Sequence, residues 1–323
     1  MRRAGALLLG IIAIAACGAS WLAPNPPNRR FADLLYAPPT RVHIGDGVAM
    51  PHVHPLRIAS RLERRFDEDR STHVRLEWFS NGVLVSADPD NGAPLLLLGA
   101  DAYGRDRFAR LLHGARATLA LAVLATLFAT LIGALIGGVA GYAGGWLDSV
   151  ISRTSEFVVV LPAIYVTLAL RAMMPLVLPG STIFLLLLAI FALLGWPMVA
   201  RGVRAIVIIE RDREYAIAAR AAGASGTRLL TRHLLPAAGG YLGTQATLLL
   251  PAFILAESTM SYVGLGFPDT TPTWGTMLQD ASNVSLLGDA PWALAPAAAI
   301  FMVVLGVNLL VQSTGRAPVQ LEP

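Results

Sequence analysis

Residues 214–236 read EYAIAARAAGASGTRLLTRHLLP and stand between two of the most apolar runs in the chain. The residues from Glu214 to Ala222 favour a helix, and Gly223 predicts its end because glycine adopts the left-handed conformation that closes many helices. A second short helix is expected over 226–234, before Pro236 begins the next apolar run. The stretch therefore predicts a helix–turn–helix between two hydrophobic segments.

The rest of the chain has the composition of a membrane protein. Of its 323 residues, 55% are hydrophobic and 14% are charged, whereas a soluble domain has about 25% charged residues. Six runs approach the length of about 20 apolar residues with which a helix crosses a bilayer. They occupy 4–23, 118–141, 156–174, 181–200, 238–260 and 292–313. Because a backbone in lipid must satisfy its own hydrogen bonds, we expect an all-α polytopic membrane protein with about six transmembrane helices.

Small residues and prolines within these runs bear on helix packing. Gly133, Gly137 and Gly141 recur at four-residue spacing, which lets two helix backbones approach closely. The neighbouring helix belongs either to this chain or to a partner subunit, and the sequence leaves both open. Pro162 and Pro251 interrupt the third and fifth runs, so kinks are expected there, in helices that face other helices.

The placement of arginine predicts the orientation of the helices. Residues 201–233 hold seven arginines against three acidic residues, and Arg2 and Arg3 add two at the amino end. Positive charge in short flanking segments stays on the cytoplasmic side. With six helices, the amino terminus and a loop at about 201–236 both lie in the cytoplasm, and the region 24–98 lies outside.

The region 24–98 is expected to be a small extracytoplasmic insertion between the first two helices. Val74, Leu76 and Trp78 alternate with polar residues, and Asn81–Gly82 precedes another β-prone run, so the pattern predicts a β-hairpin. The expected divisions are a first transmembrane helix, this insertion, a transmembrane domain and a carboxyl tail, over 1–23, 24–98, 99–313 and 314–323.

Histidines gather near the start of this insertion. His43, His52 and His54 have neither a helical frame nor a Cys-x-x-Cys frame, so they are a weak signature of a metal site. We expect exposed loop histidines and assign no metal ligand.

The amino terminus has two interpretations. Arg2, Arg3 and an apolar core ending in IAAC at 14–17 resemble a lipoprotein signal with Cys17 as the acylated residue. A retained first helix is favoured, because the apolar run passes through Cys17 to Leu22.

Lysine is missing from the chain, since all 25 basic residues are arginine. A phosphate-binding loop needs a lysine, so any ATP and Mg²⁺ that drive this protein are expected on other subunits.

Gly223–Gly226 matches the Gly-x-Ser-Gly of intramembrane proteases, with Ser225 as nucleophile. Ser225 lies in a charged loop, however, and no histidine follows His233 to supply a base from a later helix. A protease and a passive channel stay remote alternatives, and no catalytic residue is expected.

The opening stretch resembles the cytoplasmic coupling loop of ABC-importer permeases. That loop has the pattern Glu-Ala-Ala, three residues, Gly, nine residues, Ile, one residue, Leu-Pro. Ala218 and Ala219 precede Gly223 at this spacing, and Leu235 and Pro236 follow it at the matching distance. Ile217 and His233 depart from the pattern, since they stand where the family has Glu and Ile.

Two further stretches resemble the second permease subunit of oligopeptide, dipeptide and nickel importers. GADAYGRDRFARLLHGARATL at 99–119 is similar to that group's segment before the second helix, with Gly104, Arg105 and Asp106 at its motif positions. LAESTMSYVGLGFPDTTPTWGTML at 255–278 is similar to that group's Ala-Glu-Ala-Ser-Leu-Ser-Phe-Leu-Gly-Leu-Gly…Pro-x-Trp-Gly block. The resemblance covers about 99–313.

This resemblance implies a permease subunit of an ATP-driven importer in the bacterial inner membrane. Its implied partners are a second permease subunit, two ATP-binding subunits, an extracytoplasmic substrate-binding protein and membrane lipid, with no nucleic acid. Peptides are the expected cargo, with nickel or another small solute as the alternative. The residues implied in coupling to the ATPase are Glu214, Ala218, Ala219, Arg220, Gly223, Leu235 and Pro236.

Three residues near the end of the fifth run are candidates for the translocation path: Glu257, Ser258 and Tyr262. Acidic side chains inside membranes are costly and often line a pathway. The alternative is an interfacial carboxylate that pairs with an arginine such as Arg116.

Overall fold

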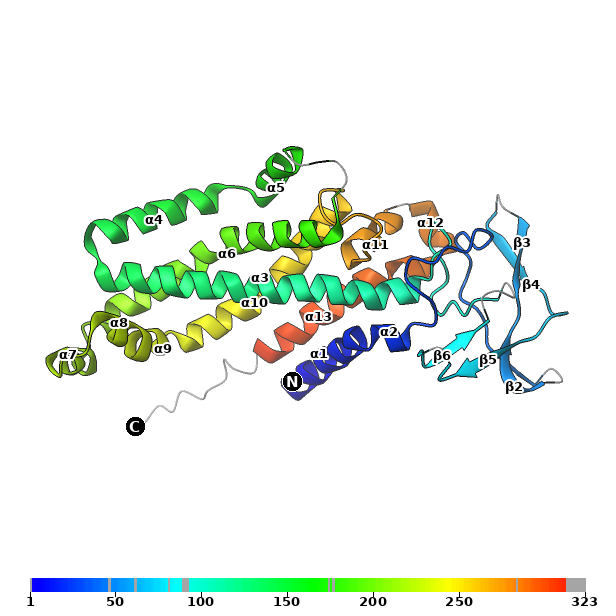
Figure 1. Cartoon of the computed structure of the whole chain (residues 1–323), viewed down its shortest axis with the longest axis horizontal. Coiled ribbons are helices and arrows are strands. Elements are labelled where there is room, and N and C mark those ends of the chain that lie inside the picture. The colour runs from blue at the N-terminus through cyan, green and yellow to red at the C-terminus, as the bar shows by residue number, and fades with distance from the viewer. Residues whose placement is uncertain are drawn as a thin grey trace, which may run out of the picture. The chain divides into compact units, whose positions relative to one another are not determined.

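The computed structural model describes residues 2–45, 48–60, 63–80, 82–88, 93–173, 175, 178–282 and 284–311. Figure 1 shows a largely helical chain with its labelled strands confined to one stretch near the amino end. The chain divides into two compact units, one over Met1–Leu119 and Ser258–Leu310 and the other centred on Ala120–Glu257. The predicted tail over 314–323 lies outside the described residues.

Among the described residues, four helical segments are long and apolar enough to cross a membrane. They are α3 (Arg107–Ala143), α6 (Gly180–Glu210), α10 (Gly239–Tyr262) and Pro291–Val311, which combines η3 (Pro291–Leu294) with α13 (Ala295–Val311). A fifth candidate is a broken pair, α4 (Gly145–Val160) and α5 (Ala163–Ala172), bent by 87°. The predicted all-α polytopic membrane fold is confirmed.

The first apolar run forms two shorter helices. These are α1 (Arg2–Cys17) and α2 (Ala19–Leu22), which meet at Gly18. With 16 and 4 residues, each is shorter than the four unbroken spanning candidates, which have 21 to 37 residues. The remaining five runs all fall on the spanning candidates described above.

One predicted helix boundary needs correction, and the two prolines differ in their effect. The coupling loop was expected at about 201–236, but α6 continues to Glu210 because no glycine or proline interrupts 203–210. The loop therefore begins at Arg211. Pro162 separates α4 from α5, and Leu161 before it is extended, as a residue preceding proline prefers. By contrast, α10 runs through Pro251 without a break.

The glycine stripe of α3 packs against α6 of the same chain. A side-chain carbon at Gly133 would lie 2.6 Å from Val199 Cβ, and one at Gly137 would lie 2.7 Å from Ala200 Cα. At Gly141 it would lie 2.7 Å from the carbonyl oxygen of Arg204. Of the two packing partners left open by the sequence, the structure supports the one within the chain. On α6, Arg204 also forms an ion pair with Asp148 of α4.

The strands form a four-stranded antiparallel sheet and a separate hairpin. The sheet has the order β1-β2-β5-β6, and the hairpin pairs β3 with β4. The strand bounds are β1 His43–Gly45, β2 Val48–Val53, β3 Leu56–Ser60, β4 Arg65–Glu68, β5 Val74–Trp78 and β6 Val85–Ala87. The core cluster on the sheet contains Val53, Val74, Leu76, Ala87, Ala93 and Leu95.

The predicted β-hairpin corresponds to β5 and β6, with Trp78 opposite Val85. The connection is longer than the expected two-residue turn: it runs over 79–84, and the Phe79 amide donates to the Leu84 carbonyl at 3.0 Å. Asn81, on which the turn was predicted, lies outside the described residues.

The histidines of this region are not the exposed loop residues that were expected. His43 belongs to β1 and His52 to β2, while His54 follows β2 directly. The side chain of His52 is fully buried, and His54 is 2% exposed. The prediction was wrong because the strand register, which the spacing of these residues did not reveal, carries them into the sheet.

Candidate functional site

The segment between α6 and α10 is a chain of short helices, which we call the coupling segment (211–238). It contains α7 (Glu214–Ala221), α8 (Gly226–Leu229), the π-helical turn η2 (Leu230–Leu234) and α9 (Leu235–Ala237). Figure 1 shows α7, α8 and α9 grouped between the ends of α6 and α10. The second helix expected over 226–234 corresponds to α8 together with the π turn η2.

Gly223 ends α7 in the predicted way. Its φ is +84°, in the left-handed region that glycine adopts without strain. The Gly223 amide donates to the Arg220 carbonyl at 2.9 Å, and the Ala224 amide donates to the Ala219 carbonyl at 3.0 Å. This pair of bonds is a Schellman motif, which satisfies carbonyls at the end of a helix. The glycine therefore fixes the angle at which the chain leaves α7.

The surface of α7 is mostly small and apolar. Ala218 is exposed, and so are Tyr215 (42%) and Ile217 (55%), while Ala216 is fully buried. Of the other residues assigned to coupling, four are exposed and two are half-buried: Glu214, Arg220, Gly223 and Pro236, then Ala219 and Leu235. Glu214 in the first turn and Arg220 in the last complement the helix dipole. The structure brings the predicted coupling residues onto one continuous segment.

The coupling segment is fastened to the carboxyl end of α3. Arg211 donates from Nη1 to the Gly141 carbonyl at 2.9 Å, and the Arg220 guanidinium lies 5.6 Å from the centre of the Tyr142 ring. A side-chain carbon at Gly226 would lie 2.9 Å from Tyr142 Oη. Both halves of the segment therefore contact the last residues of α3.

Ser225 has a structural role at the start of α8. Its side-chain oxygen accepts a hydrogen bond from the Arg228 amide at 3.4 Å, which is the helix N-cap arrangement. This role accounts for a serine at this position without the protease chemistry considered from the sequence.

The motif residues Gly104, Arg105 and Asp106 shape the start of α3. Gly104 has a φ of +72°, and Asp101 Oδ1 accepts hydrogen bonds from the Tyr103 and Arg105 amides, each at 2.9 Å. Asp106 Oδ1 accepts from the amides of the next turn at 2.9 and 3.2 Å, so Asp106 caps α3. The motif thus forms a tight turn that leads into the helix.

A buried charge network connects this turn with the segment before α11 (Trp274–Ala281). Arg105 donates to Asp101 at 2.7 Å and to both carboxylate oxygens of Asp269, at 2.6 and 3.0 Å. Arg110 also donates to Asp269, at 3.2 Å. Burial by itself would raise the pKa of Asp269, but the hydrogen bond from Arg105 and the charges of Arg110 and Arg105 outweigh it and lower that pKa. We call Asp101, Arg105, Arg107, Arg110, Asp269 and Asp280 the Arg105 network.

The same network reaches α11 itself. Arg107 donates to Asp280 at 3.1 Å and to the Ala100 carbonyl at 3.0 Å. Burial raises the pKa of Asp280 even though Arg107 opposes that effect. The network therefore connects two of the three sequence motifs, the stretches 99–119 and 255–278, and extends beyond them to Asp280.

A side chain of α11 caps the carboxyl end of α10. Gln279 donates from Nε2 to the carbonyls of Ser261 and Tyr262, at 2.9 and 3.0 Å. These are among the last carbonyls of α10, which have no partner within the helix. A side-chain carbon at Gly275 would lie 2.7 Å from Ser258 Cα, so α11 packs closely on this end.

The three residues proposed for the translocation path differ in exposure. Glu257 is fully buried, Ser258 is 5% exposed and Tyr262 is 47% exposed. Arg116, considered as an ion-pair partner of Glu257, donates to the carbonyls of Ala16 and Cys17. The assignment of these three residues to a path stays a prediction.

Several residues of the Arg105 network were not singled out from the sequence: Asp101, Arg107, Arg110, Asp269 and Asp280. Asn25 was also missed; it donates to Asp106 at 2.9 Å and to the Leu95 carbonyl at 2.8 Å. One signal was present. The stretch 99–119 carries four arginines, and acidic residues stand before α11, at 269, and near its end, at 280.

Comparison with known proteins assigns the chain to a family. Residues 133–316 match the family of binding-protein-dependent transport system inner membrane components. The chain belongs to this family. The matched stretch contains the whole coupling segment, and the resemblance to ABC-importer permeases is confirmed. As an inner membrane component of this family, the chain is a multi-pass transport protein.

Individual relatives match different lengths of this chain. A putative peptide permease protein of Brucella ovis is 37% identical over 213 residues, 66% of this chain and 68% of the relative. A dipeptide transport system permease protein of Alkalihalophilus pseudofirmus is 35% identical over 66% of this chain and 67% of the relative. A di/tripeptide transport system permease protein of Pseudomonas aeruginosa is 29% identical over 95% of this chain and 83% of the relative. The last likeness includes most of the stretch that precedes α3.

Proposed function

We propose that this permease is one of two transmembrane subunits of an ATP-driven importer of peptides. A second permease subunit completes the translocation path, two ATP-binding subunits dock on the cytoplasmic side, and a substrate-binding protein delivers cargo from outside. ATP and Mg²⁺ bind to the ATPase subunits, since this chain has no lysine for a phosphate-binding loop.

The coupling segment is the observation that carries this proposal. An exposed apolar face on α7, a fixed turn at Gly223 and direct contacts from Arg211 and Gly226 to α3 form a lever. A partner that closes on α7 would move α3 with it, and such a discrete displacement is what coupling between two states requires. No catalytic role is assigned to any residue of the chain.

Peptides are the cargo that the relatives favour. Those named above are permeases for peptides, dipeptides or tripeptides. A glutathione transport system permease protein of Shigella flexneri, 38% identical over 66% of this chain, transports a small peptide by its name. Nickel stays the alternative, and none of these relatives supports it.

The orientation follows from the arginines of the coupling segment and of the amino end. Both lie in the cytoplasm in this proposal, with α1 and α2 retained as a membrane segment, and the strands β1–β6 lie outside. The importer is then placed in the bacterial inner membrane with the binding protein on the side of the strands.

The test is site-directed cross-linking in the reconstituted complex. Cys17, the free cysteine, is replaced by serine, and a photoreactive maleimide is attached at Ala218→Cys. We expect a product that joins this chain to an ATPase subunit, and its yield should change when ATP binds. Ser80→Cys, in the loop between β5 and β6, is the matched control and should give no such product.

Transport by the same complex tests the cargo. Proteoliposomes that contain all subunits should accumulate a labelled peptide only with ATP and the binding protein. A product from Ser80→Cys with none from Ala218→Cys would contradict the docking site, and uptake of nickel without peptide uptake would contradict the cargo.

A further inference from the structure

Three histidines meet on one face of the β1-β2-β5-β6 sheet. Strands β2 and β5 pair in antiparallel fashion with Val53 opposite Val74, so His54 and His73, the next residues, stand opposite each other. His52 lies two residues before His54 and therefore on the same face, because side chains alternate along a strand. The two histidines of the His-x-His sequence and the third histidine on the neighbouring strand therefore point to the same place.

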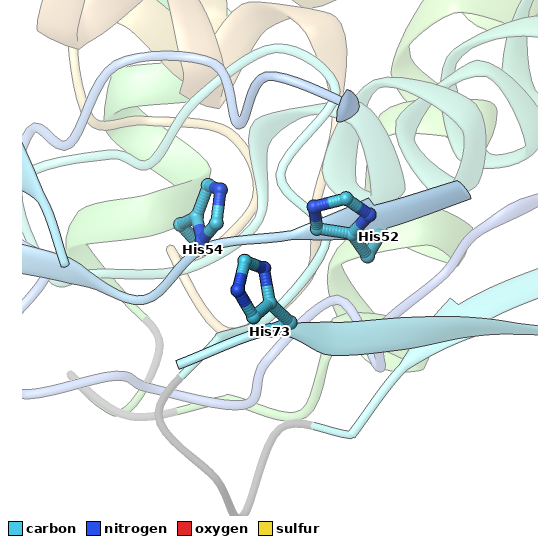
Figure 2. A group of neighbouring side chains, drawn as sticks. All are labelled: His52, His54 and His73. Atoms are coloured by element: carbon cyan, nitrogen blue, oxygen red, sulfur yellow. The ribbon is translucent and has the colours of Figure 1, made fainter. Parts of the chain in front are cut away.

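The three rings are close enough to share an ion. Their centroids are 5.2 Å apart for His52 and His54, and 4.9 Å apart from His73 to each of them. One ring nitrogen from each residue lies within 4.8 Å of the other two. Figure 2 shows the three rings grouped together, two from one stretch of chain and the third from the beginning of the neighbouring strand.

Hydrogen bonds determine which nitrogen atoms are available. His52 Nδ1 lies 3.2 Å from the Met50 carbonyl oxygen, and His54 Nδ1 lies 2.9 Å from that of Thr72. A carbonyl oxygen only accepts, so in each neutral ring Nδ1 carries the proton and Nε2 keeps its lone pair. Both Nε2 atoms are buried and have no hydrogen-bond partner within the part of the chain that the structure describes.

This arrangement is unfavourable unless something binds the lone pairs. Burying a polar atom without a partner costs free energy, and protonating neighbouring buried rings would place like charges side by side. A metal-bound histidine normally donates its other ring N–H to a backbone carbonyl, which fixes the ring and its tautomer. His52 and His54 both have this second contact in place.

We propose that His52, His54 and His73 bind one Zn²⁺ ion through their ring nitrogens and so join β2 to β5. Three imidazole donors suit zinc and neighbouring transition metals, and such sites leave a fourth position for water or another ligand. Zinc–nitrogen bonds of about 2.0–2.1 Å place the donors about 3.4 Å apart, so the rings must close by rotation. His73 has the freedom to do this, because its side chain is exposed.

One acidic and one basic residue lie near the cluster: Glu68, which would favour a bound cation, and Arg75, which would oppose it. The His43 ring lies 4.8 Å from that of His54, and His43 Nε2 is 3.3 Å from Glu68 Oε2, so a carboxylate stands next to the cluster. Arg75 pairs with His52 across the strands, but it is exposed and its charge is solvated. The ion would tie together strands of a small β-region that has a modest hydrophobic core.

The experiment is a Zn²⁺ titration of the full-length chain, purified through a tag without histidine and stripped with a chelator. Calorimetry at pH 7.5 should show one ion per chain, and Co²⁺ in its place should give the visible absorption of a low-coordinate nitrogen site. His73→Gln should weaken binding at least tenfold. Affinity should also fall at pH 5.5, because protons compete for the ring nitrogens.

The control is His233→Gln, a histidine of the coupling segment outside the cluster, which should bind Zn²⁺ as the wild type does. His73 is the test position because its exposed side chain can be replaced without disturbing the buried pair; His52→Gln should show the same loss if it folds. A wild-type chain that binds no stoichiometric ion, or a His73→Gln chain with unchanged affinity, would overturn the proposal.

Discussion

Arg105 holds Asp269 with two hydrogen bonds, from Nη1 to Oδ2 at 2.6 Å and from Nη2 to Oδ1 at 3.0 Å, although 164 positions separate the two residues. The chain leaves one compact unit along α3 just after Arg105 and returns to it before Asp269. This ion pair therefore ties the point of departure to the point of return. The relationship shows that the two sequence motifs are in direct contact.

Replacing Arg105 by alanine should destabilise the chain strongly. Asp101, whose side chain is 3% exposed, would lose the nearer of its two guanidinium partners and keep only that of Arg110 at 3.7 Å. Breaking a buried ion pair in this way costs about 3–5 kcal/mol. The measurement is thermal unfolding of the purified permease in detergent, followed by size-exclusion chromatography. Arg65→Ala is the control, since its pair with Asp67 is 67% and 63% exposed, and it should leave the transition within about 0.5 kcal/mol.

The pH dependence of stability should contain a component from Asp106. Burial raises the pKa of Asp106 to about 6, against 3.8 for an ordinary aspartate. Between these values the folded chain binds more protons than the unfolded chain, so this residue makes stability fall as pH rises, by up to about 3 kcal/mol. Asp269 acts in the opposite sense: its pKa is lowered, so its contribution is present above pH 3.8 and is lost as pH falls through its folded pKa.

Asp106→Asn separates these two components. Asparagine also caps helices, so the start of α3 is kept while the titrating group is removed. As pH rises from 4 to 6, the wild type loses the contribution of Asp106 and the variant does not. The stability of the variant relative to the wild type should therefore increase over this range in thermal unfolding experiments. A constant difference between the two proteins over this range would show that Asp106 does not titrate there.

Gly223→Val should uncouple ATP hydrolysis from transport. Nothing lies within 4 Å of a side-chain carbon at Gly223, so the effect comes from the backbone, whose φ of +84° costs a β-branched residue roughly 1–2 kcal/mol. Stimulation of ATPase activity by the loaded binding protein should be lost in the reconstituted complex, with abundance near wild type. Gly223→Asn is the matched control, because asparagine tolerates this conformation, and it should keep most of the stimulation.

Gly226 offers a comparison from the same turn. Its backbone is not left-handed, but an added carbon would lie 2.9 Å from Tyr142 Oη, the far end of a side chain that can shift. Gly226→Ala should therefore be milder than Gly223→Val in the same assay. Equal loss in both variants would mean that contact with α3, and not the angle after α7, controls coupling.

Gly137→Ala should destabilise the packing of α3 against α6. The added carbon would lie 2.7 Å from Ala200 Cα, a contact that only movement of the backbone relieves. We expect a loss of about 1–3 kcal/mol in thermal unfolding, as for other overpacked cores. Gly243→Ala in α10 is the control: it meets nothing within 4 Å and should be neutral or stabilising, because alanine favours helix. If Gly137→Ala unfolds at the same temperature as the wild type, α3 and α6 are not in tight contact at this glycine.

The membrane fold and the coupling segment were predictable because both depend on local pattern. Apolar length predicted the helices, and Gly223 predicted the end of α7 through a backbone requirement that one residue carries. The Arg105 network was not predictable in this way, since Asp269 meets Arg105 only through the tertiary fold. The prediction for the histidines was wrong for the same reason: His73 meets His52 and His54 only once β2 is paired with β5. The α6 boundary was misplaced because Arg201 and Arg204 interrupt the apolar run, whereas the helix continues through 205–209 to Glu210.

The π turn η2 has a consequence for the direction in which α10 faces. A π turn closes on the fifth residue along instead of the fourth, so Leu230–Leu234 holds one residue more than an α-helical turn would. Each residue of a helix rotates the next by about 100°. Deleting a single residue there would preserve the helical connection but turn α8 and α7 around the axis relative to α10. The angular phase of a membrane helix is thus set in the coupling segment, a few residues before that helix begins.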